Sequence, residues 1–157
     1  MKVTLLTIAK TEENYLREGL ELYEKRIKHY LPFQLVALPA PKKQGNLSVE
    51  TQKRQEGKSF LDYFAPPDIV VLLDEKGKEH SSMEFSRYLQ GYMNTGIKQL
   101  VFVIGGPYGF SEELYKRANA TLSLSKLTFS HQMVRLFFVE QLYRAMTILK
   151  GEPYHHE

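Results

Sequence analysis

Cysteine and tryptophan are absent from this chain of 157 residues. Without cysteine, the chain can form neither disulfides nor thiolate metal sites, and nothing in it points to an oxidising compartment. Its five histidines form no ligand-like cluster with acidic residues, so we expect no metal site. Residues 1–20 also lack the apolar core of a signal peptide, because they carry the charged side chains Lys10, Glu12, Glu13, Arg17 and Glu18. We therefore expect a cytoplasmic protein.

Long hydrophobic runs are missing as well. The most apolar segment, residues 133–149, is interrupted by Arg135, Glu140, Gln141 and Arg144, and it is too short and too polar to span a bilayer. We expect a buried or interface helix there, with no contact to a membrane. The chain is 43% apolar and 25% charged, which is typical of a globular protein, and its length suits a single domain over residues 1–157.

Charge of one sign is only slightly in excess, with a formal net charge of +3 and an isoelectric point near 9.0. The distribution of charge is more informative than the total. One window contains only Glu50 and Glu56 as acidic residues, and its basic residues are Lys42, Lys43, Lys53, Arg54 and Lys58. A basic window of this kind can dock a polyanion, so it is a candidate contact surface for RNA.

Short apolar runs alternate with amphipathic segments along the chain. The runs predict strands over residues 1–9, 33–38, 69–73 and 100–104. The other segments predict helices that begin near Thr11, Ser48, Ser81, Ser111 and His131. Thr11 is the expected cap of the first helix, Ser81 and Glu84 match a capping box, and a charged loop is expected over residues 74–80. This order of elements predicts an α/β protein with a mainly parallel sheet flanked by helices.

A glycine-rich turn follows the apolar run at residues 100–104. Gly105, Gly106 and Gly109 allow the backbone to approach a ligand closely, and Ser111 then caps a short helix. Ligands of α/β proteins gather at such junctions between a strand and a helix, although an ordinary turn would have the same composition. The turn lacks both the GxGxxG fingerprint and the phosphate-loop Gly-Lys-Ser/Thr, which disfavours a plain nucleotide-binding module.

The C-terminal third contains two further unusual segments. Residues 121–129, TLSLSKLTF, alternate polar and apolar residues and then lose phase at Lys126, which predicts a short strand that runs into an irregular loop. A plain edge strand is the alternative. The helix expected over residues 131–150 is apolar on most of its circumference, so we expect it to pack against the sheet and against a second subunit.

Four segments together resemble one protein family. They are IGGPYGF at residues 104–110, LSLSKLTF at residues 122–129, HQMVRLFFVEQLYRA at residues 131–145 and GEPYHHE at residues 151–157. In this order and spacing they resemble the SPOUT methyltransferases, and most closely the small bacterial enzymes of the RlmH type, which methylate N3 of a pseudouridine in 23S ribosomal RNA of the large subunit. The resemblance extends from the N-terminal KVTLLTIAK through the LLDEKGK segment to the C-terminus.

The resemblance implies a fold, a cofactor and a set of site residues. The fold would be a SPOUT-like α/β domain whose C-terminal part forms a deep trefoil knot, paired as a homodimer through the knot and the last helix. The cofactor would be S-adenosyl-L-methionine, bound by Leu73, Gly105, Leu124, Ser125, Lys126, Leu127, Thr128 and Phe129. The candidate catalytic residues are His131, Arg135, Tyr154 and His155, where Arg135 would hold a phosphate or the uracil oxygens. Arg144, four residues after Glu140, is the pattern of an ordinary helix-surface pair.

The expected substrate is ribosomal RNA in the assembled ribosome. No separate RNA-binding domain is apparent in the sequence, so the surface of the dimer would have to select the substrate, and a preformed ribosomal substrate suits this better. Two alternatives remain at this point. A knotted methyltransferase that acts on transfer RNA would share the cofactor site, and a non-catalytic RNA-binding or ribosome-binding protein would use the same charges without binding the cofactor.

Overall fold

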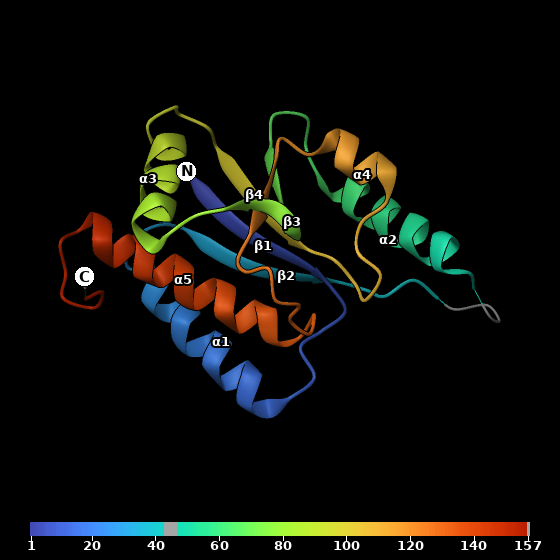
Figure 1. Ribbon diagram of the computed structural model, residues 1–157, viewed down its shortest axis with the longest axis horizontal. Helices are drawn as coiled ribbons and strands as arrows, with labels where there is room; N and C mark the ends of the chain where they lie inside the picture. Colours follow the sequence, from blue (N-terminus) through green and yellow to red (C-terminus); the bar gives the residue numbers. More distant parts are fainter. Residues whose placement is uncertain (43–46, 157) are drawn as a thin grey trace.

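A single sheet of five parallel strands forms the centre of the protein (Figure 1), for which a computed structural model describes residues 1–42 and 47–156. The strands are β1 (Lys2–Ile8), β2 (Phe33–Leu38), β3 (Ile69–Glu79), β4 (Gln99–Ile104) and β5 (Ala120–Ser123). Their order in the sheet is β2-β1-β4-β3-β5, and every pair is parallel. The mainly parallel α/β sheet predicted from the sequence is therefore confirmed.

Helices cover both faces of this sheet, as Figure 1 shows. They are α1 (Asn14–Ile27), α2 (Val49–Tyr63), α3 (Ser82–Met93), α4 (Glu112–Arg117) and α5 (Met133–Leu149). Buried side chains of α1, α3 and α5 share one hydrophobic cluster with one face of the sheet. Those of α2 and α4 share a second cluster with the other face. Strand residues alternate between the two clusters because successive side chains of a strand point to opposite faces.

Three helices begin with the serine caps that the sequence predicts. The side chains of Ser48 and Ser111 each accept a hydrogen bond from a backbone N–H three residues further on. Ser81 and Glu84 form the complete capping box. Such caps satisfy backbone donors that the first turn of a helix leaves unpaired.

The start of α1 differs from the prediction. The helix begins at Asn14, three residues later than expected, and Thr11 does not cap it. The Thr11 hydroxyl instead accepts a hydrogen bond from Arg135 Nη1 at 3.1 Å, and the backbone N–H of Glu12 donates to Gln132 Oε1 at 3.0 Å. Contacts with α5 and the residue before it therefore hold this segment outside the helix.

The expected charged loop at residues 74–80 is also corrected, because β3 continues to Glu79. The strand is irregular at this point, since both Leu73 and Lys78 pair with Leu122 of β5. Residues 74–77 consequently bulge out of the ladder. A side chain at Gly77 would lie 2.7 Å from the backbone nitrogen of Leu122, so only glycine fits beside β5.

The C-terminal segments follow the sequence pattern closely. Residues 120–123 form β5, and residues 124–132 lack regular structure, as expected for a short strand that runs into a loop. The helix α5 packs against both α1 and α3. No helix in the described ranges is long and apolar enough to cross a membrane. The trefoil knot stays a prediction.

Candidate active site

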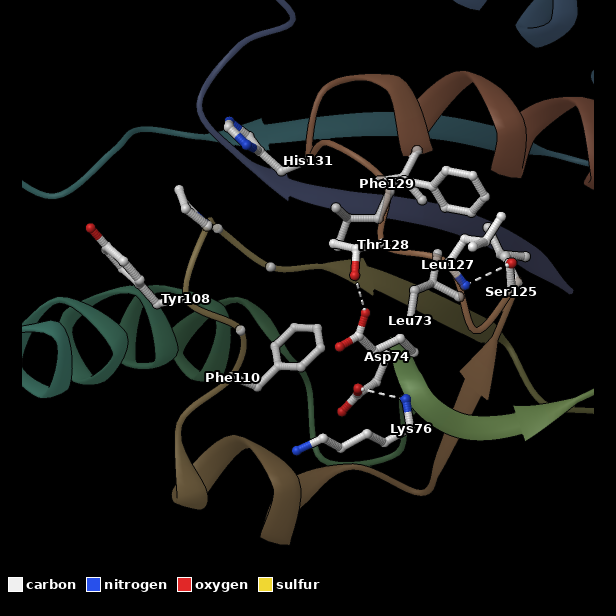
Figure 2. Close-up of a pocket in the computed structure, with 18 of the residues that line it drawn as sticks. Leu73, Asp74, Lys76, Tyr108, Phe110, Ser125, Leu127, Thr128, Phe129 and His131 are labelled. Carbon is white, nitrogen blue, oxygen red and sulfur yellow. Dashed lines mark hydrogen bonds between the residues drawn. The ribbon is translucent and has the colours of Figure 1, made fainter.

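A cavity of about 520 Å³ lies beside the bulge of β3 and the carboxyl end of β4. Three segments that are distant in the sequence line most of it, namely residues 73–76, 104–110 and 124–134 (Figure 2). The carboxyl ends of parallel strands are the usual place for ligands in α/β proteins. The volume also falls in the range of small-molecule binding sites. The cavity is therefore the candidate site for a cofactor.

The glycine turn forms one wall. Gly109 has a φ of 83°, in the left-handed region that favours glycine, and its N–H donates to the carbonyl oxygen of Gly106 at 3.2 Å. A side chain at Gly105 would lie 2.9 Å from Cε1 of Phe110, which also lines the cavity. A side chain at Gly106 would lie 2.6 Å from Oε1 of the buried Glu56 on α2. Both glycines are thus needed to bring the turn close to its neighbours.

The loop after β5 forms the opposite wall. Five of its six expected cofactor residues line the cavity, namely Leu124, Ser125, Leu127, Thr128 and Phe129. Within the described part of the chain, Lys126 does not contribute to this lining. The Ser125 hydroxyl accepts a hydrogen bond from the backbone N–H of Leu127 at 3.0 Å, which shapes the turn between the strand and the loop. Figure 2 shows these side chains together with Leu73 around the cavity.

Acidic and basic groups lie between the two walls. Asp74 accepts hydrogen bonds from the backbone N–H of Lys76 at 3.0 Å and from the hydroxyl of Tyr115 on α4. Burial and this bond to Asp74 raise the pKa of Tyr115, so the phenol keeps the proton that it donates. Glu75 accepts a hydrogen bond of 2.7 Å from the Thr128 hydroxyl, and Lys53 of α2 also lines the cavity. Asp74 and Glu75 were not among the site residues predicted from the sequence, although their place directly after an apolar run was a signal for them.

His131 and Arg135 have different surroundings although they lie one helical turn apart. His131 lines the cavity, next to the start of α5. Arg135 is only 1% exposed and does not belong to the lining in the described structure. Its guanidinium donates to the backbone carbonyl oxygens of Ile8, Ala9 and His131, and burial lowers its pKa to about 10. This position favours a structural role over the phosphate contact that was expected.

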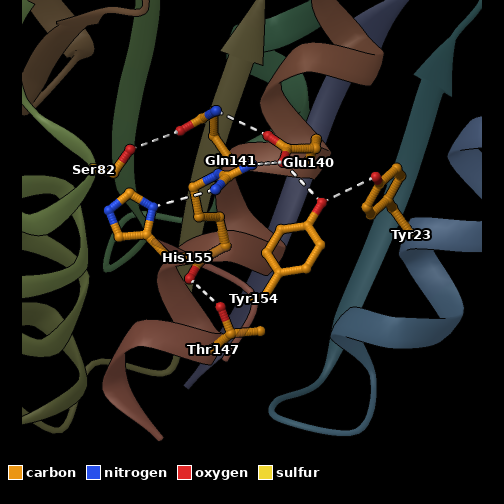
Figure 3. Close-up of polar contacts among 8 residues, drawn as sticks. Tyr23, Ser82, Glu140, Gln141, Thr147, Tyr154 and His155 are labelled. Atoms are coloured by element: carbon orange, nitrogen blue, oxygen red, sulfur yellow. Dashed lines mark hydrogen bonds and ion pairs between the residues drawn. The ribbon is translucent and has the colours of Figure 1, made fainter. Parts of the chain in front are cut away.

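Tyr154 and His155 pack beside α5 at Glu140 and Arg144, whereas His131 lies before the start of the helix. The Tyr154 hydroxyl donates to Glu140 Oε1 at 2.9 Å, and Arg144 Nη2 contacts the same oxygen at 2.6 Å (Figure 3). Arg144 Nη1 lies 3.2 Å from His155 Nδ1, and its guanidinium carbon lies 4.8 Å from the centre of the Tyr154 ring. Arg144 and Glu140 are therefore more than a helix-surface pair, because they bind the C-terminal segment to α5.

Hydroxyl groups around Tyr154 complete this cluster. Tyr23 of α1 lies 3.2 Å from the Tyr154 hydroxyl oxygen. Burial, together with the hydrogen bonds to Tyr23 and Glu140, raises the pKa of Tyr154. The expected catalytic residues thus divide into two groups within one chain, because His131 lies before α5 and lines the cavity, whereas Tyr154 and His155 contact Glu140 and Arg144 further along the helix.

Metal ligands do not gather at either place. Across residues 1–42 and 47–156, no group of three or more histidine, aspartate or glutamate side chains could hold a metal ion.

Comparisons with known proteins agree with these features. A family model described as "Predicted SPOUT methyltransferase" matches residues 1–155. The chain is 55% identical over 157 residues to a protein of Parabacteroides distasonis named "Ribosomal RNA large subunit methyltransferase H", and the match covers 100% of both chains. A protein of Christiangramia forsetii with the same name is 56% identical over 156 residues, with 99% of each chain covered.

One solved structure shares the fold. It is a probable methyltransferase from Bordetella pertussis Tohama I, with a TM-score of 0.56 and 11% sequence identity, and the match covers 92% of this chain and 96% of that one. Because the family model and the relatives both match almost the whole chain, the protein belongs to the SPOUT methyltransferase family, in the RlmH-type group that its sequence motifs resemble.

Proposed function

We propose that this protein is an S-adenosyl-L-methionine-dependent methyltransferase that methylates N3 of a pseudouridine in 23S ribosomal RNA of the large subunit. The observation that carries the proposal is the cavity beside the bulge of β3 and the carboxyl end of β4, between the glycine turn and the loop over residues 124–129. The relatives that share more than half of the sequence over its full length are named as ribosomal RNA large subunit methyltransferases. We also propose that residues 1–157 form one methyltransferase domain, with the C-terminal knot that the family resemblance implies.

The residues present suit this cofactor. Adenine needs an apolar slot, which Leu124, Leu127 and Phe129 can provide. The absence of a side chain at Gly105 keeps Phe110 in place as part of the same wall. Leu73, Ser125, Lys126 and Thr128 complete the proposed set, in which backbone groups of the loop would supply hydrogen bonds. When bound, S-adenosylmethionine supplies an electrophilic methyl group on a positively charged sulfur.

The chain's own residues have three tasks in the reaction. They must bind the target base, exclude water and accept the proton that N3 loses before it becomes a nucleophile. His131 is the proposed proton acceptor because its imidazole lines the cavity and histidine is the side chain that most often acts as a general base. Tyr154 and His155 would orient the base, and the tyrosine ring offers a face for stacking. For Arg135 we propose that it supports the start of α5, without direct contact to RNA.

A homodimer would bring the two groups of residues together. In an isologous pair, antiparallel packing of α5 on its symmetry mate would place the C-terminal segment of one subunit near the cavity of the other. The exposed apolar side chains of Met133 and Phe137 on α5 suit such a contact. The ring centres of Phe137 and Phe129 are 5.0 Å apart, so the same surface continues into the loop of the cavity. This arrangement would make each active site depend on both subunits.

The basic window is the proposed docking surface for ribosomal RNA. Arg54 and Lys58 are exposed one turn apart on α2, and Lys42 is exposed before the helix. Lys53 extends the window to the cavity, since it lines the cavity as well. Lys43 lies outside the described residues. Phosphate contacts of this kind would position the RNA and leave recognition of the base to the cavity.

Transfer of a labelled methyl group tests the proposal. The substrates are assembled ribosomes, separated subunits, naked ribosomal RNA and transfer RNA, all from cells that lack this gene, and the product is mapped by mass spectrometry. We expect label at N3 of a large-subunit pseudouridine, with ribosomes as the preferred substrate. Label on transfer RNA, or binding of RNA without binding of S-adenosylmethionine, would contradict the proposal in favour of one of the two alternatives.

A further inference from the structure

The bulge in β3 places two acidic side chains in the lining of the cavity. Regular pairing with β5 stops at Leu73 and resumes at Lys78, so residues 74–77 leave the ladder. Three of these four residues, Asp74, Glu75 and Lys76, line the cavity, and the fourth is the glycine that fits against the backbone of β5. Bulges often redirect a side chain toward a site. This bulge interrupts a core strand and places polar side chains in the wall of the cavity.

Asp74 serves the bulge itself. One of its carboxylate oxygens accepts the backbone N–H of Lys76 at 3.0 Å, and the other accepts the hydroxyl of Tyr115. The first bond holds the turn, and the second attaches α4 to it. Because both oxygens have partners in the protein, Asp74 shapes the wall and leaves ligand contact to its neighbour.

Glu75 reaches across the cavity to the loop after β5. Its Oε2 accepts a hydrogen bond of 2.7 Å from Thr128 Oγ1. Thr128 lies between Leu127 and Phe129, two of the side chains proposed to hold adenine. A carboxylate therefore lies beside the side chains proposed to hold adenine.

The chemistry of that position favours a diol over a cation. A carboxylate is an acceptor with room for several hydrogen bonds, and the ribose of adenosine offers two adjacent hydroxyl donors. Acidic side chains bind ribose hydroxyls in the same way at the strand ends of dinucleotide-binding sheets. The described cavity lining contains two carboxylates and two lysines, Lys53 and Lys76, so attraction for a positively charged ligand is largely balanced.

We propose that Glu75 accepts hydrogen bonds from the ribose hydroxyls of the methyl donor, with Thr128 holding its carboxylate in place. The inference rests on the proposed function and adds a side chain that recognises the ribose of the cofactor. In this arrangement Glu75 is a cofactor-binding residue, and the bulge of β3 positions it in the cavity.

Calorimetric titration with S-adenosylmethionine tests this first. Glu75→Ala and Glu75→Gln are each expected to lower the affinity about tenfold or more, as expected for hydrogen bonds to a charged group. Glu79→Gln is the matched control, because Glu79 is an exposed carboxylate of the same strand that does not line the cavity, and its affinity should equal that of the wild type. Wild-type affinity in both Glu75 variants would overturn the inference.

Neutral nucleosides separate the sugar contact from an effect of charge. Adenosine, 2′-deoxyadenosine and 3′-deoxyadenosine are compared as competitors of labelled S-adenosylmethionine. The wild type should prefer adenosine, and Glu75→Ala should lose that preference. If Glu75→Ala weakens S-adenosylmethionine binding but keeps the preference for adenosine, the carboxylate acts on the positive charge and the inference is wrong. If the wild type does not bind S-adenosylmethionine at all, both the proposed function and this inference are wrong.

Discussion

Arg135 of α5 donates a hydrogen bond of 2.8 Å to the carbonyl oxygen of Ile8, the last residue of β1. The same guanidinium donates to Ala9 O at 2.9 Å and to the Thr11 hydroxyl, while its Nε donates to His131 O at 3.1 Å. Ala9 has a φ of 64°, an uncommon conformation for a residue other than glycine. One buried side chain therefore ties the segment after β1 to the residues that precede α5.

Substitution of Arg135 should reduce stability strongly. Arg135→Met would leave buried carbonyl oxygens without donors, so we expect a loss of about 3 kcal/mol in the free energy of unfolding. Urea denaturation measures the loss, and Arg54→Met on the exposed side of α2 serves as the control with little change. Equal unfolding midpoints for Arg135→Met and the wild type would show that this network is dispensable.

The surroundings of Arg135 illustrate what the sequence could not reveal. A lone arginine on a helix is most often exposed, and its burial here depends on how α5 packs against the end of β1, more than a hundred residues away in the chain. The same long-range contact explains why Thr11 failed as a predicted cap. The serine caps of α2, α3 and α4 were predictable because each depends on residues within one turn.

Substitution of Gly105 should prevent cofactor binding through Phe110. Any side chain at residue 105 would lie 2.9 Å from the Phe110 ring, so Gly105→Val must displace a wall of the cavity. We expect no measurable binding of S-adenosylmethionine by calorimetry in a variant that still folds.

Gly91→Ala provides the matched control for that experiment. Apart from the neighbouring backbone of its own helix α3, no atom of the described residues lies within 4 Å of the position that its Cβ would occupy. The substitution should raise stability by roughly 0.5–1 kcal/mol and leave cofactor affinity unchanged. Wild-type affinity in Gly105→Val would contradict the assignment of the cavity as the cofactor site.

The candidate site was predictable where it is formed by continuous sequence. The glycine turn and the loop over residues 124–129 line the cavity because each follows a core strand directly. A loop was predicted where the structure has the bulge at residues 74–77. The sequence could not reveal that β3 resumes after it, because that pairing depends on β5, a strand far along the chain. The contact between Tyr154 and Glu140 could not be predicted from the sequence either, because the residues near a C-terminus do not show whether that segment binds to the domain.

Loss of the His131 side chain should affect transfer more than binding. His131→Ala removes the proposed proton acceptor from the cavity while leaving the glycine turn and the loop over residues 124–129 intact. We expect wild-type affinity for S-adenosylmethionine and a rate of methyl transfer lower by about 100-fold. His29→Ala, in the exposed turn after α1, should retain full activity. Normal turnover by His131→Ala would exclude the proposed role.

Tyr154 should act as a neutral phenol throughout the working range of pH. Its surroundings raise its pKa above the ordinary value of 10.0, so its hydrogen bond to Glu140 is fully present below pH 10.0 and weakens only as the pH rises through the higher value of the folded state. Tyr154→Phe should therefore lower methyl transfer by a similar factor at every pH between about 6 and about 9, with cofactor affinity unchanged. Loss of an alkaline limb of the pH–rate profile in Tyr154→Phe would show instead that the tyrosine ionises during the reaction.

The proposed dimer depends on the exposed face of α5. Phe137 is 45% exposed, and a charge at this position would be buried and unpaired in an antiparallel contact between two copies of the helix. We expect Phe137→Glu to be a monomer by light scattering under conditions in which the wild type is a dimer, and to have lost methyl transfer because Tyr154 and His131 no longer meet. Leu22→Glu on α1, where the native leucine is 47% exposed, should remain a dimer and stay active. A dimeric Phe137→Glu variant would place the subunit contact elsewhere, and an active monomer would show that one chain contains the complete site.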